Sequence, residues 1–176
     1  MKRAPVTVLV ATLLFAAVAL AQTQMPKPGA EHKKLDYFAG TWSSDGELKP
    51  SPYGPGGKFS GTDHNEWMEG GFFLVSHSEG TGPMGNDKGL AVWGYNSEDR
   101  VYTYHAFNTF GEAIAAKGTV DGDTWTWTNE EKMGGKLVKG RYTIKQLSPT
   151  SYTFKLELAP EGADWATMME GKATKK

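Results

Sequence analysis

The spacing of apolar residues changes near Gly40. Before it, Leu35 and Phe38 lie three positions apart, a helical spacing that predicts one short helix over Glu31–Ala39 with Gly40 at its end. From Thr41 onward, apolar and polar residues alternate in short runs separated by clusters of Gly, Pro, Asn and Asp, the pattern of strands joined by tight turns. This alternation predicts strands over Thr41–Leu48, Lys58–Glu69, Phe72–Glu79, Lys88–Tyr95, Arg100–Phe110, Glu112–Val120, Asp123–Asn129, Lys136–Leu147, Ser151–Leu158 and Trp165–Ala173.

These runs predict an all-β fold in which consecutive strands form an antiparallel meander, because no βαβ pattern interrupts them. An open meander would leave two exposed edges that invite aggregation, whereas closure removes them. We therefore expect a closed or nearly closed antiparallel meander β-barrel of about ten strands, with the short N-terminal helix capping one end. Such a barrel is wider than one that side chains nearly fill, so its lumen should hold a cavity or a plug.

Turn residues also predict the register of individual hairpins. Asp121-Gly122 is a strong signal for a two-residue hairpin loop. That loop would place Gly118 opposite Trp125 and Ala116 opposite Trp127. Small residues would then face both indole rings across the strand pair.

A second hairpin brings two histidines together. If Gly70-Gly71 forms a two-residue loop, His64 lies directly opposite His77, with β-carbons about 5 Å apart on one face. Two imidazoles so placed, with Glu66 as a third ligand, are a candidate site for zinc or copper. The alternative is a pair of surface histidines on a hairpin whose other face packs inward. Because a slip of one residue would separate the pair, no metal is predicted.

His105 lies among apolar residues in the middle of an expected strand. A four-residue turn over residues 96–99 would place it opposite Leu90, on a face that also carries Val92 and Phe107. A histidine in such surroundings is a candidate polar anchor in an otherwise apolar cavity. The alternative is a core histidine bonded to a hydroxyl or to the backbone. For a general base it lacks a carboxylate partner at a readable spacing.

Aromatic residues are the main candidates for lining a ligand pocket. The sequence has six Trp, seven Tyr and eight Phe, and such side chains can enclose an aromatic or lipid-like molecule or can form the core of the barrel. One polar group, His105 or Tyr142, would fix the orientation of the ligand. The expected ligand-binding set is His105, Tyr142, Trp67, Trp93, Trp125, Trp127 and Phe107.

The N-terminus has the pattern of a secretory signal peptide. Lys2 and Arg3 precede an apolar run over residues 6–20, and the segment closes on Ala-Leu-Ala at residues 19–21. The run is shorter than the roughly 20 residues of a membrane-spanning helix. We therefore expect a signal peptide over residues 1–21, a flexible leader over 22–30 and one barrel domain over 31–176, with a secreted or periplasmic location after cleavage near Ala21.

Composition excludes several classes of function. The absence of Cys removes thiol nucleophiles, Cys-ligated zinc and iron–sulfur clusters. With 19 basic and 20 acidic residues the formal net charge is −1, and without a basic cluster neither nucleic acid nor an anionic membrane is an expected partner. The sequence lacks a nucleophile elbow, a phosphate-binding loop and a dinucleotide fingerprint. No cofactor is therefore predicted, and binding is favoured over catalysis.

Three segments resemble a known family. Residues 35–42 (LDYFAGTW) resemble the opening of calycin barrels, in which a short helix leads into Gly-x-Trp on the first strand. Residues 67–73 (WMEGGFF) and 94–96 (GYN) are similar to the family called domain of unknown function 1579, in order and at compatible spacing. The resemblance spans most of the chain and implies a lipocalin-like barrel, without an established activity.

The sequence departs from relatives of this fold at two points. Lipocalins stack an Arg from a late strand on the first-strand Trp, whereas the last expected strand here offers Lys172 and Lys175. Haem-binding nitrobindins use a His near the C-terminus as the iron ligand, and no His follows His105. The resemblance therefore does not imply haem binding.

The leading hypothesis is an exported lipocalin-like barrel that binds a small apolar or aromatic molecule in its lumen. One alternative is a small enzyme or metal-binding protein that uses His105 or the His64/His77 pair. Another is a filled barrel that acts through its outer surface as an interaction module of the cell envelope. The identity of the ligand, the oligomeric state and the inward face of the second and third strands stay open.

Overall fold

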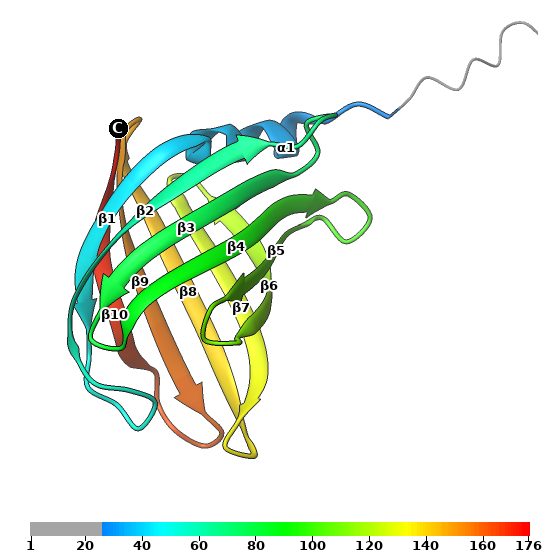
Figure 1. Cartoon of the computed structure of the whole chain (residues 1–176). Coiled ribbons are helices and arrows are strands. Elements are labelled where there is room, and N and C mark those ends of the chain that lie inside the picture. Colours follow the sequence, from blue (N-terminus) through cyan, green and yellow to red (C-terminus); the bar gives the residue numbers. More distant parts are fainter. Residues whose placement is uncertain (1–25) are drawn as a thin grey trace, which may run out of the picture.

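Within residues 26–176, which the computed structural model describes, ten strands wrap into a barrel and a short helix lies across one end (Figure 1). The expected signal peptide over residues 1–21 and the first part of the expected leader lie outside the described residues. The helical segment consists of α1 (Ala30–Lys34) and one 3₁₀ turn, η1 (Leu35–Phe38). The strands are β1 (Gly40–Leu48), β2 (Gly57–Trp67), β3 (Leu74–Gly82), β4 (Gly85–Asn96), β5 (Val101–Asn108), β6 (Ala113–Asp121), β7 (Thr124–Met133), β8 (Lys136–Ser148), β9 (Ser151–Pro160) and β10 (Ala166–Lys175).

The sheet closes on itself. Each strand pairs antiparallel with its neighbours in sequence, and β1 also pairs with β10, from Trp42 opposite Lys175 to Leu48 opposite Met169. Each strand corresponds to one of the expected runs, with ends displaced by a few residues. The predicted closed antiparallel meander barrel is therefore confirmed.

The β6–β7 hairpin departs from its expected register. Its loop lies one residue later than predicted, at Gly122-Asp123, so Trp125 faces Val120 and Trp127 faces Gly118. A β-carbon at Gly118 would lie 2.5 Å from the indole ring of Trp127, so glycine is the residue that lets this ring lie across the neighbouring strand. Because the shift amounts to two residues along the partner strand, both indoles keep the expected face.

Hydrogen bonds hold the helical segment across the end of the barrel. The indole Nε1 of Trp42 and the amide Nδ2 of Asn65 both donate to the carbonyl oxygen of Phe38, at 2.9 and 2.7 Å. The indole Nε1 of Trp67 donates to Asp36 Oδ1 at 2.9 Å. These donors come from β1 and β2, so the first two strands and the helix form one bonded unit.

The end of the barrel beneath the helix is densely packed. Leu35 and Phe38 point into the barrel and are fully buried together with Trp42 and Trp125. The ring of Phe38 lies 5.2 Å from the ring of Trp125 and 4.9 Å from that of Trp93, measured between ring centroids. We call this layer the capped end, and the opposite half of the barrel the open end.

Candidate functional site

Next to the capped end, the inner wall of the barrel carries a carboxylate. Asp63 alternates with Asn65 and Trp67 on the inner face of β2, and the register places it between Trp42 of β1 and Ser78 of β3. Its side chain keeps part of its accessible surface. Because neighbours on both sides are paired in the closed wall, that surface faces the lumen.

Asp63 is an ionisable group that is largely removed from solvent. Burial raises the pKa of its carboxyl from an ordinary value of 3.8 to about 6. Within residues 26–176, no hydrogen bond or ion pair contributes to this pKa, and burial is its cause. A buried carboxylate without a partner destabilises the folded state once it ionises.

Three tyrosines from other strands share the electrostatic surroundings of Asp63. Burial raises the pKa of Tyr104 on β5 to about 12 and that of Tyr142 on β8 and Tyr152 on β9 above the usual range, and the charge of Asp63 adds to each rise. Their hydroxyls therefore stay protonated near neutral pH and can act as hydrogen-bond donors or acceptors.

Indole rings complete this wall. The rings of Trp93 and Trp127 meet edge to face at 5.3 Å between centroids, and Tyr104 lies 5.2 Å from Trp93. In the described part of the chain, the buried indole nitrogens of Trp93, Trp125 and Trp127 have no hydrogen-bond partner. Buried donors are normally paired in folded proteins. Because these nitrogens have almost no accessible surface, the wall offers a ligand its rings and not its indole N–H groups.

Two phenylalanines lie farther toward the open end. The rings of Phe59 and Phe154 are 6.1 Å apart. A β-carbon at Gly46 would lie 2.7 Å from Phe59 Cζ, and one at Gly171 would lie 2.5 Å from Phe154 Cζ. Glycine at these two positions lets each ring lie against the barrel wall.

The charged residues of the lumen are mainly acidic. Asp87 of β4 lies opposite Gly80, and Glu131 of β7 lies opposite the buried Val138, so both alternate onto the inner face toward the open end. In residues 26–176, the basic residues of the strands alternate to the outer wall, apart from Lys175 at the capped end and Lys136 at the tip of the β7–β8 hairpin. The lumen between these two ends therefore has an excess of negative charge.

The structure brings part of the expected ligand-binding set together. Trp93, Trp127 and Tyr142 lie on the inner face, where Tyr142 shares the electrostatic surroundings of Asp63 and Trp93 also contacts Phe38 of the capped end. Trp125, with 1% of its surface exposed, and Trp67, bonded to the helical segment, belong to the capped end instead.

The expected inward position of His105 and Phe107 is wrong. Both lie on the outer wall of β5, where Phe107 is 55% exposed, and His105 faces Val92, two residues out of the expected register. His105 and Phe107 share a face with Leu90 and Val92 as expected, but this face points away from the barrel interior. The alternate face of β5 carries Tyr102 and Tyr104, whose larger rings fill the interior.

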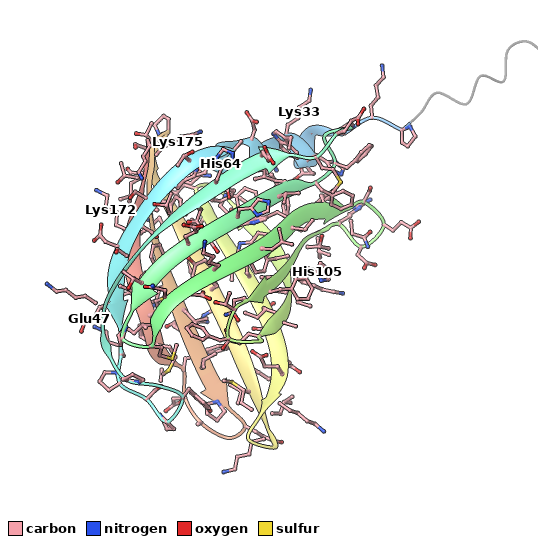
Figure 2. The ribbon with its side chains drawn as sticks, viewed as in Figure 1. Lys33, Glu47, His64, His105, Lys172 and Lys175 are labelled. Carbon is pink, nitrogen blue, oxygen red and sulfur yellow. The ribbon has the colours of Figure 1, made fainter. Side chains whose placement is uncertain are left out.

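His105 instead lines a groove of about 560 Å³. Figure 2 labels this residue on β5. Pairing between β6 and β7 ends at Lys117 opposite Thr128, and the groove lies where the two strands separate. Its wall includes Thr103, His105, Ala115, Lys117, Thr128 and Trp165. Most of these side chains belong to the outer face of the barrel.

The two histidines of the β2–β3 hairpin are neighbours, as the expected register predicted. His64 lies opposite His77, and both are exposed on the outer wall. Nδ1 of His64 lies 3.1 Å from Thr41 Oγ1, and its Nε2 lies 3.9 Å from Glu66 Oε2. Among residues 26–176, no group of three or more His, Asp or Glu side chains is arranged to hold a metal ion.

Asp63, Tyr104 and Tyr152 were not among the residues expected from sequence. A signal for Asp63 was present: along β2 it has the same parity as Phe59 and Trp67, whereas the other parity carries exposed polar residues. Assigning the aromatic parity to the interior would have placed Asp63 in the lumen.

The position that an arginine takes in lipocalins is occupied by a lysine. Lys175 lies opposite Trp42, with its ammonium nitrogen 5.5 Å from the centre of the indole ring. Figure 2 labels Lys175 near the end of the barrel that the helix covers. A cation therefore stacks on the first-strand Trp here too, without the planar guanidinium.

A closed meander, a helical cap at one end and a lumen lined by aromatic side chains define a lipocalin-like, or calycin, barrel. The chain belongs to the protein family of unknown function DUF1579, whose family model matches residues 27–175.

Comparison with solved structures agrees with this fold. The chain is similar to Rv2717c from M. tuberculosis, with a TM-score of 0.58, 11% identity, and coverage of 84% of this chain and 98% of that one. It is also similar to the S-type phycobiliprotein lyase CPES from Guillardia theta, with a TM-score of 0.57, 11% identity, and coverage of 84% and 93%. At these identities the likeness concerns the fold alone. A search of curated proteins finds none that matches the sequence.

Helices long and apolar enough to cross a membrane do not occur within residues 26–176.

Proposed function

We propose that this protein is an exported binding protein that holds a small aromatic molecule in the lumen of its barrel. The observation that carries the proposal is the pair of indole rings of Trp93 and Trp127, which meet edge to face on the inner face of the wall. They lie beside tyrosines that keep accessible surface inside a closed wall. Export rests on the sequence pattern of residues 1–21.

The chemistry of the wall supports an aromatic ligand. Edge-to-face and offset contacts with Trp93, Trp127 and Tyr104 stabilise a planar ring beyond the burial of its surface. The hydroxyls of Tyr104 and Tyr142, which keep accessible surface, supply a few directed hydrogen bonds, as expected for a site that fixes the orientation of an apolar ligand. The bonded helix and strands of the capped end give this wall a rigid base.

Two alanines on adjacent strands offer a matched test of the location of the site. Ala106 of β5 lies on the inner face and Ala115 of β6 lies exposed on the outer face. We expect Ala106→Trp to weaken binding of a naphthalene probe at least tenfold by filling the lumen, and Ala115→Trp to leave it within twofold. Binding is to be measured by quenching of tryptophan fluorescence, with urea unfolding as the control that both variants fold. Equal affinities in the two variants would contradict a site in the lumen.

A second candidate function follows from the outer groove beside His105. The groove contains Trp165, whose ring lies 4.3 Å from the guanidinium carbon of Arg141, and the charged side chains of Lys117 and Lys139. An interaction through this face would fit the alternative of an envelope interaction module. The same pair of variants separates the two candidates, because a partner in the groove would be displaced by Ala115→Trp and unaffected by Ala106→Trp.

A further inference from the structure

We infer that the ligand of the lumen is an organic cation, an aromatic molecule with a protonated amine that is bound between Asp63 and the surrounding aromatic rings. This inference rests on the proposed function and names the class of ligand that the site takes. The contact would be an amine N–H that donates to the Asp63 carboxylate, a charge-assisted hydrogen bond.

The charge of the lumen is the first reason. Asp63 is enclosed by the wall and is not paired with a cation in residues 26–176. Asp87 and Glu131 add negative charge on the inner face toward the open end. A cation that enters from that end is attracted by all three carboxylates, whereas an anion is repelled.

The aromatic rings are the second reason. The faces of Trp, Tyr and Phe rings attract cations through their quadrupoles, and the attraction strengthens when water is excluded. Trp93, Trp127 and Tyr104 lie within 5.8 Å of one another by their ring centroids, so they form one aromatic wall. An ammonium or alkylammonium group beside Asp63 would be close to this wall, while the aromatic part of the ligand packs against the rings.

The groups that face Asp63 set the pH range of this pairing. Tyr104, Tyr142 and Tyr152 influence it through charge and keep their protons up to strongly alkaline pH. Ser78 of β3 does not ionise, and Lys175 of β10 lies over the intervening indole of Trp42. Since Asp63 itself titrates near pH 6, binding of a cation should weaken as the pH falls from 7.5 to 5.

Three naphthalene probes of one size test the preference for charge. They are 1-naphthylmethylamine (cation), 1-naphthalenemethanol (neutral) and 1-naphthoate (anion), titrated against the mature chain at pH 7.5 with tryptophan fluorescence as the readout. We expect the amine to bind about tenfold more tightly than the alcohol, and the carboxylate to bind most weakly. Equal affinity for amine and alcohol would overturn the inference while leaving the proposed lumen site intact.

A matched pair of substitutions assigns the preference to Asp63. Asp63→Asn should lower the affinity for the amine about tenfold, leave that for the alcohol within twofold, and abolish the weakening at pH 5. Asp45→Asn, at an exposed aspartate of β1, should change none of these values. A preference for the amine that survives Asp63→Asn would also overturn the inference. If none of the three probes binds, the inference fails together with the proposed function.

Discussion

The two halves of the barrel use the same residue types in opposite ways. At the capped end, Trp42 and Trp67 are packed and their indole nitrogens donate to Phe38 and Asp36 of the helical segment. Toward the open end, the indole nitrogen of Trp127 has no partner in the described residues. Trp125 Nε1 and Asn65 Oδ1 at the capped end are also without partners in residues 26–176. The two halves therefore differ in whether their side chains bond the helical segment.

This difference separates stability from function. A buried donor or carboxylate without a partner costs about 1–3 kcal/mol or more, so a wall that contains several of them is not optimised for folding. The capped end can offset that cost because its side chains are densely packed and because Trp42, Asn65 and Trp67 bond the helical segment. Residues that stabilise the fold should thus lie near the helix, and residues that lower its stability should lie around Asp63.

The largest expected difference between the two halves is in the contribution of their large side chains to stability. Trp42 is fully buried, so Trp42→Ala should lower the free energy of unfolding by about 4 kcal/mol. Phe59 keeps part of its surface accessible, so Phe59→Ala should cost about half as much. Urea unfolding followed by circular dichroism measures both. A larger loss for Phe59→Ala would mean that the open end is the true core.

The next largest expected effect is a gain in stability, because it comes from substituting Asp63. Because the folded protein holds the Asp63 proton up to about pH 6 and the unfolded chain releases it near 3.8, the folded state binds more protons between these values. Stability from this group is therefore full below about pH 4 and falls as the pH rises to about 6, by about 2–3 kcal/mol. In Asp63→Asn, this loss of stability between pH 4 and pH 6 should be absent.

The measurement is the difference in unfolding free energy between Asp63→Asn and the wild type at pH 4 and pH 8. We expect a small difference at pH 4 and a more stable variant at pH 8. Asp45→Asn serves as the control for the change of one surface charge. A variant that is less stable than the wild type at pH 8 would show that Asp63 has a structural partner.

The smallest expected effects come from two tyrosines on one face of β5, whose hydroxyl groups are compared. The hydroxyl of Tyr102 donates to Glu31 Oε2 at 2.6 Å, so Tyr102→Phe should cost about 1–2 kcal/mol in unfolding free energy. Tyr104 lies two residues along and faces the lumen, and the pKa of its hydroxyl is raised by burial and by the charge of Asp63, with no contribution from a hydrogen bond within residues 26–176. Tyr104→Phe should therefore change the free energy of unfolding by less than about 0.5 kcal/mol. Equal costs for the two variants would contradict the division of the barrel into two halves.

The fold could be predicted from sequence because the alternation of residues and the turn signals specify it repeatedly. Each strand has its own period-two run, so small errors in the β6–β7 loop did not change which residues share a face. The side of the wall was harder to predict. On β5, both faces carry apolar residues, and only the packing of Tyr102 and Tyr104 inside the barrel sends His105 outward.

The site was only partly predictable for a related reason. Aromatic residues such as Trp93 and Trp127 are candidates for a pocket by composition alone. Asp63 becomes meaningful only when the inner face of β2 is known and the tyrosines of β5, β8 and β9 are brought across the lumen. Contacts between strands so far apart in sequence have no local signal.

The most direct test of the lumen site is a ¹H–¹⁵N spectrum of the tryptophan indoles during titration with 1-naphthylmethylamine. The indole N–H resonances of Trp93 and Trp127 should shift in a saturable way, while that of Trp165, in the outer groove, should stay in place. Shifts confined to Trp165, with Trp93 and Trp127 unchanged at saturation, would place binding on the outer wall and contradict a binding site inside the barrel.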